Sequence, residues 1–87
     1  MVSFVVASAA TPPQELYFAA LAREQTVRAA LSAENAPANV NTEVRTVVAA
    51  YQEIVRLHPT SGYSDNALWQ GGRLSIDAFA VPAVRGP

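Results

Sequence analysis

The chain has 87 residues, enough for one small domain, and a chain this short buries only about 60% of the surface that its unfolded form exposes. It has no cysteine and one histidine, His58, which excludes disulfide cross-links and zinc sites built from thiolates or paired imidazoles. Six arginines, no lysine and seven acidic residues give a net charge of −1 with interspersed signs, which argues against a general nucleic-acid binder. With 51% apolar residues and no apolar run long enough to span a membrane, the composition predicts a soluble, alanine-rich helical domain.

Residues 1–10 carry no charge and end near Ala7-Ser8-Ala9, the small-x-small pattern that signal peptidase accepts. The basic segment that normally precedes the apolar stretch of a signal peptide is missing. A start codon assigned too late, inside a longer export signal, would explain its absence. We therefore interpret residues 1–10 as the remnant of a truncated signal peptide and expect an exported protein of the periplasm or cell envelope. The alternative is a frayed apolar N-terminus or a short strand.

A first helix is predicted over residues 12–33. Thr11 can cap it, a proline follows at the first helical position, and Gln14 completes a capping box. Glu24 and Arg28 form a favourable i,i+4 pair that we place on the polar side. The opposite side carries an apolar stripe for burial, made of Leu16, Tyr17, Ala20, Leu21, Val27 and Leu31.

A second helix is predicted over residues 42–58. Asn41 or Thr42 can cap it, and Pro59 stops it. A strand is the competing interpretation because the segment is rich in β-branched residues, but its apolar residues do not alternate. They fall instead at helical spacing: Val44, Val47, Val48, Tyr51, Ile54 and Val55.

A third helix is predicted over residues 65–80, and residues 82–87 form an irregular tail. Ser64 is the predicted N-cap, and Tyr63 with Leu68 has the spacing of a hydrophobic staple.

Two features of this third helix indicate close or multiple neighbours. The pair Gly71-Gly72 lowers the stability of a helix by roughly 2 kcal/mol relative to two alanines. Two glycines with this effect suggest that another helix backbone approaches there. Leu68 and Trp69 lie about 100° apart around the axis, so we expect this helix to face two neighbours.

No motif for catalysis, cofactor binding or metal binding occurs in the chain, and we predict no catalytic residue, cofactor or metal site. His58 is interpreted as a residue of the helix C-terminus, where an imidazolium interacts well with the dipole. Glu53 and Arg56 are interpreted as solvated residues of a helix face, as are Arg23 and Glu24.

Residues 50–69 carry a recognisable pattern. Tyr51 precedes the helix-ending Pro59 by eight residues, and a Pro-x-Ser-x-Tyr-x-x-x-Ala-Leu turn follows. This stretch resembles the junction between two tetratricopeptide repeats in the variant common among bacterial envelope proteins. The resemblance implies packing roles for Tyr51, Pro59, Tyr63, Ala67, Leu68, Trp69 and Gly72.

More narrowly, residues 62–79 and 15–31 look like the N-terminal repeat region of exported N-acetylmuramoyl-L-alanine amidases, and the resemblance spans residues 14–80. Those enzymes cleave peptidoglycan with a zinc site in a separate C-terminal domain. Pro82 and Gly86 stand where the next repeat helix should begin, and no catalytic domain follows. Neither the amidase activity nor its metal ligands can be carried over to positions of this chain.

The sequence thus predicts an all-α domain over residues 11–81, with three helices in an antiparallel, tetratricopeptide-like array of about one and a half repeats. We expect a non-catalytic interaction scaffold of the cell envelope, without a transmembrane helix, that binds a protein partner or a second copy and associates with cell-wall machinery. The alternative is a self-assembling structural subunit. The candidate binding residues, whose alternative role is a plain solvated face, are Asn66, Gln70, Arg73, Gln52 and Arg56.

Overall fold

The computed structural model describes residues 11–33 and 38–80. It contains the helices α1 (Pro13–Ser32), α2 (Val40–Leu57) and α3 (Gly62–Ser75), and a π-helical segment, η1 (Ile76–Ala80), that continues α3. No strand occurs among the described residues, and the predicted all-α class is confirmed. The interpretations of residues 1–10 and 82–87 lie outside the described residues.

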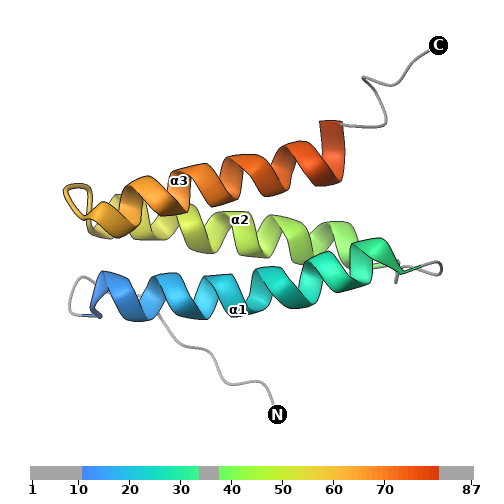
Figure 1. Ribbon diagram of the computed structural model, residues 1–87, viewed down its shortest axis with the longest axis horizontal. Helices are drawn as coiled ribbons and strands as arrows, with labels where there is room; N and C mark the ends of the chain where they lie inside the picture. The colour runs from blue at the N-terminus through green and yellow to red at the C-terminus, as the bar shows by residue number, and fades with distance from the viewer. Residues whose placement is uncertain (1–10, 34–37, 81–87) are drawn as a thin grey trace.

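The three helices lie side by side, with α1 and α3 running in the same direction and α2 running against both (Figure 1). Helix α2 packs against both of the others, and α1 also touches α3. This arrangement brings the N-termini of α1 and α3 to one end of the molecule. It also forms a seam along which side chains of α1 and α3 meet.

The core lies between the three helices and is centred on α2. As its spacing predicts, α2 buries Val44, Val47, Tyr51 and Ile54. Helix α1 adds Ala20 and Val27 to the core, and α3 adds Ala67 and Leu74. A buried apolar set this small gives only marginal stability, so polar contacts between the helices are important for the fold.

The predicted starts of α1 and α2 are wrong by one or two residues. Pro12 is the N-cap of α1 and Asn39 that of α2, and neither makes a side-chain cap hydrogen bond. Pro13 can open α1 without a cap because its fixed φ suits the helix and its missing N–H is one that the first turn leaves unpaired. In α2 the Glu43 N–H donates to the Asn39 carbonyl oxygen at 3.1 Å, so the helix already includes Val40.

The predicted start of α3 is wrong by three residues. Ser61 is the N-cap, and its Oγ accepts a hydrogen bond from the Tyr63 N–H at 3.1 Å. Ser64 lies inside the helix and is buried, and its hydroxyl donates to the carbonyl oxygens of His58 and Ile54. Ser64 therefore holds the end of α2 against α3 instead of capping α3.

The predicted staple between Tyr63 and Leu68 does not form. Tyr63 is part of α3, and its ring lies 5.5 Å from the Tyr17 ring and 6.1 Å from the Phe18 ring, both on α1. Leu68 points away from this aromatic cluster and is 58% exposed. The cluster therefore joins the second turn of α1 to the first turn of α3.

The close approach predicted at the two glycines occurs at Gly71. A Cβ added to Gly71 would lie 3.4 Å from the Tyr51 Cβ, whereas one added to Gly72 would meet nothing within 4 Å. Gly71 lies on the buried side of α3 with Ala67 and Leu74, and Gly72 is turned about 100° away from it. The helix α3 contacts both α2 and α1, so it has the two expected neighbours, but Leu68 and Trp69, on which that expectation rested, are exposed.

Candidate functional site

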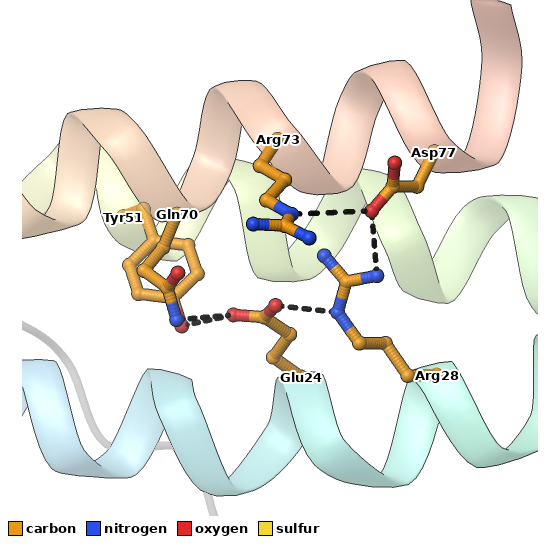
Figure 2. A network of polar contacts seen from close by, with 6 residues as sticks. All are labelled: Glu24, Arg28, Tyr51, Gln70, Arg73 and Asp77. Carbon is orange, nitrogen blue, oxygen red and sulfur yellow. Dashed lines mark hydrogen bonds and ion pairs between the residues drawn. The ribbon is translucent and has the colours of Figure 1, made fainter. Parts of the chain in front are cut away.

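A buried carboxylate lies at the seam between α1 and α3. Glu24 of α1 is only 4% exposed, and it accepts hydrogen bonds from the Tyr51 hydroxyl at 2.6 Å and from the Gln70 amide nitrogen at 3.3 Å. Its second oxygen lies 2.7 Å from Arg28 Nε (Figure 2). A buried charge is tolerated only when it is paired and hydrogen-bonded, and Glu24 meets both conditions with partners from all three helices.

The pairing of Glu24 with Arg28 was predicted, but the prediction that Glu24 is a solvated residue is wrong. Helix α3 covers this side of α1 and encloses the carboxylate. A sign of its burial is present in the sequence, because the apolar stripe of α1 skips one turn between Ala20 and Val27 and Glu24 occupies the skipped position.

The network extends from Glu24 along the seam through alternating charges. Arg28 donates from its terminal nitrogen to Asp77 Oδ2 at 2.9 Å, and Arg73 Nε lies 3.8 Å from the same oxygen (Figure 2). Asp77 belongs to η1, so these contacts connect η1 with the C-terminal part of α1. Sequence analysis missed Asp77 because nothing near it in the chain indicates a partner 49 residues away.

The surroundings of Tyr51 and Arg28 keep both groups in their ordinary protonation states. Burial, followed by the hydrogen bond to Glu24 and the charge of Glu24, raises the pKa of Tyr51 well above its ordinary value. The hydrogen bond to Glu24 raises the pKa of Arg28, against an opposing effect of burial, and Asp77 adds to the increase. Tyr51 is thus a neutral donor and Arg28 a permanent cation, which suits a structural network and not proton transfer.

Above the network, the seam is hollowed into a shallow cleft of about 330 Å³. We call it the seam cleft, and its lining residues are Glu24, Arg28, Trp69, Gln70 and Arg73. Trp69 is 61% exposed, and the Arg73 guanidinium carbon lies 5.2 Å from the centre of its ring. An exposed tryptophan stacked with an arginine is the composition typical of binding hot spots.

The five candidate binding residues do not form one site. Gln70 and Arg73 lie together in the seam cleft, and Asn66 is exposed one turn before Gln70 on the same flank of α3, at a depression next to Tyr63. Gln52 lies on α2 and lines a groove at the other flank of α3.

Arg56 also lies apart from the seam, near the end of α2, and both of its hydrogen bonds go to Glu53, at 2.7 and 2.6 Å. These hydrogen bonds raise the pKa of Arg56 and lower that of Glu53. The two residues form a solvated pair on the surface of α2.

The positions of the residues assigned to repeat packing also differ among themselves. Tyr51 and Ala67 are buried and Tyr63 is half-buried, whereas four others are exposed: Pro59, Leu68, Trp69 and Gly72. Among the residues assigned to repeat packing, only Tyr51 and Ala67 are therefore core residues, and α3 adds Gly71 and Leu74 to its buried side. Leu68 and Trp69, the large apolar residues of α3 assigned to packing, are exposed.

Among residues 11–33 and 38–80, no three histidine, cysteine or acidic side chains are placed to hold a metal ion. Within the same ranges no helix has both the length and the apolarity to cross a membrane. His58 caps the end of α2, and its Nε2 lies 2.8 Å from the Thr11 carbonyl oxygen, so it connects the start of α1 to the α2–α3 turn.

No protein-family model, curated protein or solved structure matches the chain. The seam cleft is the place where exposed aromatic surface, charge and a rigid buried network meet.

Proposed function

We propose that the chain is a non-catalytic interaction module that binds a segment of a partner protein in the seam cleft. The observation that carries this proposal is the exposure of Trp69, with Arg73 stacked on its ring, in a cleft that is also lined by the buried and hydrogen-bonded carboxylate of Glu24. Tryptophan and arginine dominate the binding energy of protein interfaces because they bury large areas and form oriented hydrogen bonds. The network beneath keeps α1 and α3 in register, which lowers the entropy lost on binding.

The side chains of the cleft indicate the chemistry of the bound segment. Arg73 Nε is 3.8 Å from Asp77, too far for a hydrogen bond, so its guanidinium donates none within the described chain. A carboxylate can accept two parallel hydrogen bonds from such a group. We infer that the partner presents a carboxylate to Arg73 and an apolar side chain to Trp69.

This proposal can be tested with synthetic 12-residue peptides. Two peptides with amidated C-termini carry a central leucine, one next to a glutamate and one next to a lysine. The third peptide ends in a leucine, whose free C-terminal carboxylate is its only acidic group. Trp69 is the sole tryptophan of the chain, so a blue shift of its emission reports binding at the cleft directly. We expect one or both carboxylate peptides to bind and the lysine peptide not to bind, and the responding peptide identifies the source of the carboxylate.

Two arginine variants supply the matched comparison. Arg73→Ala removes the guanidinium that is proposed to bind the carboxylate of the peptide. It should weaken binding by about tenfold or more, because a charge-assisted hydrogen bond is lost. Arg23→Ala removes an exposed arginine of α1 that lines a different surface and should leave binding unchanged. Equal binding of the lysine peptide, or equal affinities of the two variants, would contradict the proposal.

We also propose that the module acts in the cell envelope, as a tetratricopeptide-like part associated with a peptidoglycan amidase. The support is the repeat-junction pattern from Tyr51 to Leu68 and the Ala7-Ser8-Ala9 sequence. Antibody detection of the native protein after cell fractionation tests the location. Recovery in the envelope fraction is expected, and recovery in the cytosol alone would contradict the proposal.

The second candidate function is that of a self-assembling structural subunit. It is favoured by the large apolar side chains that α3 and η1 leave exposed, Leu68, Trp69 and Ile76. Exposed apolar side chains gathered on one helix mark an association surface.

A further inference from the structure

The flank of α3 that faces away from the seam carries a continuous apolar row. Leu68, Gly72 and Ile76 follow one another at intervals of four residues and therefore lie on one line of the helix. Leu68 is 58% and Ile76 59% exposed, and the space in front of Gly72 is open. Along the row a large side chain, a glycine and a second large side chain thus follow one another, and no described residue covers any of them.

The row borders a groove between α2 and α3 with a volume of about 180 Å³, which we call the α2/α3 groove. Leu68, Gly72 and Ser75 form its α3 wall, and Val48 and Gln52 form its α2 wall. No charged side chain lines the groove. Its apolar floor and the glycine at its edge suit the close approach of another helix.

The two ends of this surface carry opposite charges. Asp65 is exposed in the first turn of α3 at one end. Arg45 of α2 lies at the other end, with its guanidinium carbon 5.3 Å from the centre of the Phe79 ring. Gly72 stands midway in the sequence between Asp65 and Phe79.

We propose that a second copy of the chain docks on this surface with its α3 antiparallel, about a two-fold axis that passes near Gly72. A two-fold interface uses the same patch on both copies, so the patch must be complementary to itself. The rotation places Leu68 opposite Ile76 of the second copy, and Asp65 near Arg45 of the second copy. Each contact occurs twice, and the two glycines face each other where the helices cross.

Charge complementarity is the reason to identify the occupant as a second copy. An unrelated helix would need its own acidic and basic ends at the same separation, whereas a reversed copy supplies them by symmetry. The net charge of −1 per chain adds little repulsion. The dimer lies on the flank of α3 opposite the seam cleft, so it goes beyond the proposed binding function and does not depend on it.

The test is sedimentation equilibrium of the full chain over about 1 to 300 μM, a range that covers the dissociation constants of weak, transient complexes. For the wild type we expect a monomer–dimer equilibrium, with a mass rising from 9.2 kDa to twice that value. Leu68→Asp should raise the dissociation constant by about tenfold or more. Ala22→Asp is the control, since it adds the same charge at an exposed position of α1 outside the row, and it should dimerise as the wild type does.

A charge reversal tests the antiparallel arrangement and does not depend on whether Leu68→Asp folds. Asp65→Arg alone and Arg45→Asp alone bring like charges together and should each weaken the dimer, whereas the two changes in one chain should restore most of its affinity. Helicity by circular dichroism confirms that each variant is folded. The proposal would be overturned by a wild-type monomer at all concentrations, or by a trimer or open polymer. It would also be overturned by equal effects of Leu68→Asp and Ala22→Asp, or by a double variant that dimerises as weakly as the single ones.

Discussion

Removing the hydroxyl of Tyr51 tests whether the seam network stabilises the fold. Tyr51→Phe keeps the ring that fills the core, lies 6.0 Å from the Tyr17 ring and packs against Gly71. The one hydrogen bond lost is that from the hydroxyl to Glu24, at 2.6 Å. Glu24 retains its contacts with Arg28 and Gln70 but, being almost fully buried, cannot readily replace the lost donor with water.

The expected loss follows from the nature of this bond. Hydrogen bonds to charged groups contribute about 1.5–3 kcal/mol, and 2.6 Å is within the short range of hydroxyl–carboxylate bonds. We therefore expect the free energy of unfolding to fall by about 2 kcal/mol. At about 4–8 °C per kcal/mol for a domain of this size, the melting temperature should drop by roughly 8–16 °C.

The assay is urea unfolding followed by circular dichroism at low protein concentration, where self-association does not contribute. Tyr17→Phe is the control, because the Tyr17 ring makes contacts but its hydroxyl makes no hydrogen bond to any residue that the structure describes. It should change the free energy of unfolding by less than about 0.5 kcal/mol. In a chain that already carries Glu24→Gln, Tyr51→Phe should lower the free energy of unfolding by less than it does in the wild type, since the charged acceptor is gone. Equal small effects of Tyr51→Phe and Tyr17→Phe would refute the role of the network.

Three further predictions concern pH and single side chains. Because the folded state raises the pKa of Tyr51 above its ordinary 10.0, the contribution of Tyr51 to stability should be constant below pH 10 and fall above it by up to about 1.4 kcal/mol per pH unit. Unfolding curves of Tyr51→Phe between pH 9 and 11 should lack this slope, and a flat wild-type profile over that range would be evidence against it. Gly72→Ala should raise the free energy of unfolding of the monomer by about 1 kcal/mol, and Gly71→Leu should lower it by about 1–3 kcal/mol, as measured by thermal melting. Destabilisation by Gly72→Ala together with stabilisation by Gly71→Leu would contradict the close approach of α2 at Gly71. Ser64→Ala should cost about 1–2 kcal/mol in urea unfolding by removing the link between α2 and α3, whereas an effect no larger than that of Ser75→Ala would show that this link is dispensable.

The sequence predicted the helices through their apolar spacing but not their exact starts. Four residues of the α2 stripe are buried and the other two, Val48 and Val55, are half-buried, because spacing alone decides which side of a helix is apolar. Ser61 and Ser64 are both good caps, and the sequence does not say which one acts. The choice depends on the end of α2, whose carbonyl groups accept the Ser64 hydroxyl and leave Ser61 to cap α3.

The candidate site was predictable only in part. Helical spacing correctly placed Gln70 and Arg73 on one flank of α3, since that depends on local geometry alone. The burial of Glu24 and its contact with Gln70, 46 residues further on, depend on how α1 and α3 come together. Local patterns do not encode such a contact, and a charged residue type argues against burial unless its partners are known.

The most direct test of the central claim, that the seam cleft is a binding surface, is to map the bound peptide by nuclear magnetic resonance. A ¹⁵N-labelled chain would be titrated with the carboxylate peptide that shifts Trp69 emission, and amide and side-chain N–H signals would be followed. We predict that the largest shifts occur at Trp69, Gln70, Arg73 and Arg28, with those of Arg23 and Arg56 unchanged. Shifts centred on the α2/α3 groove, at Gln52 and Gly72, or shifts spread evenly over the chain, would contradict the account.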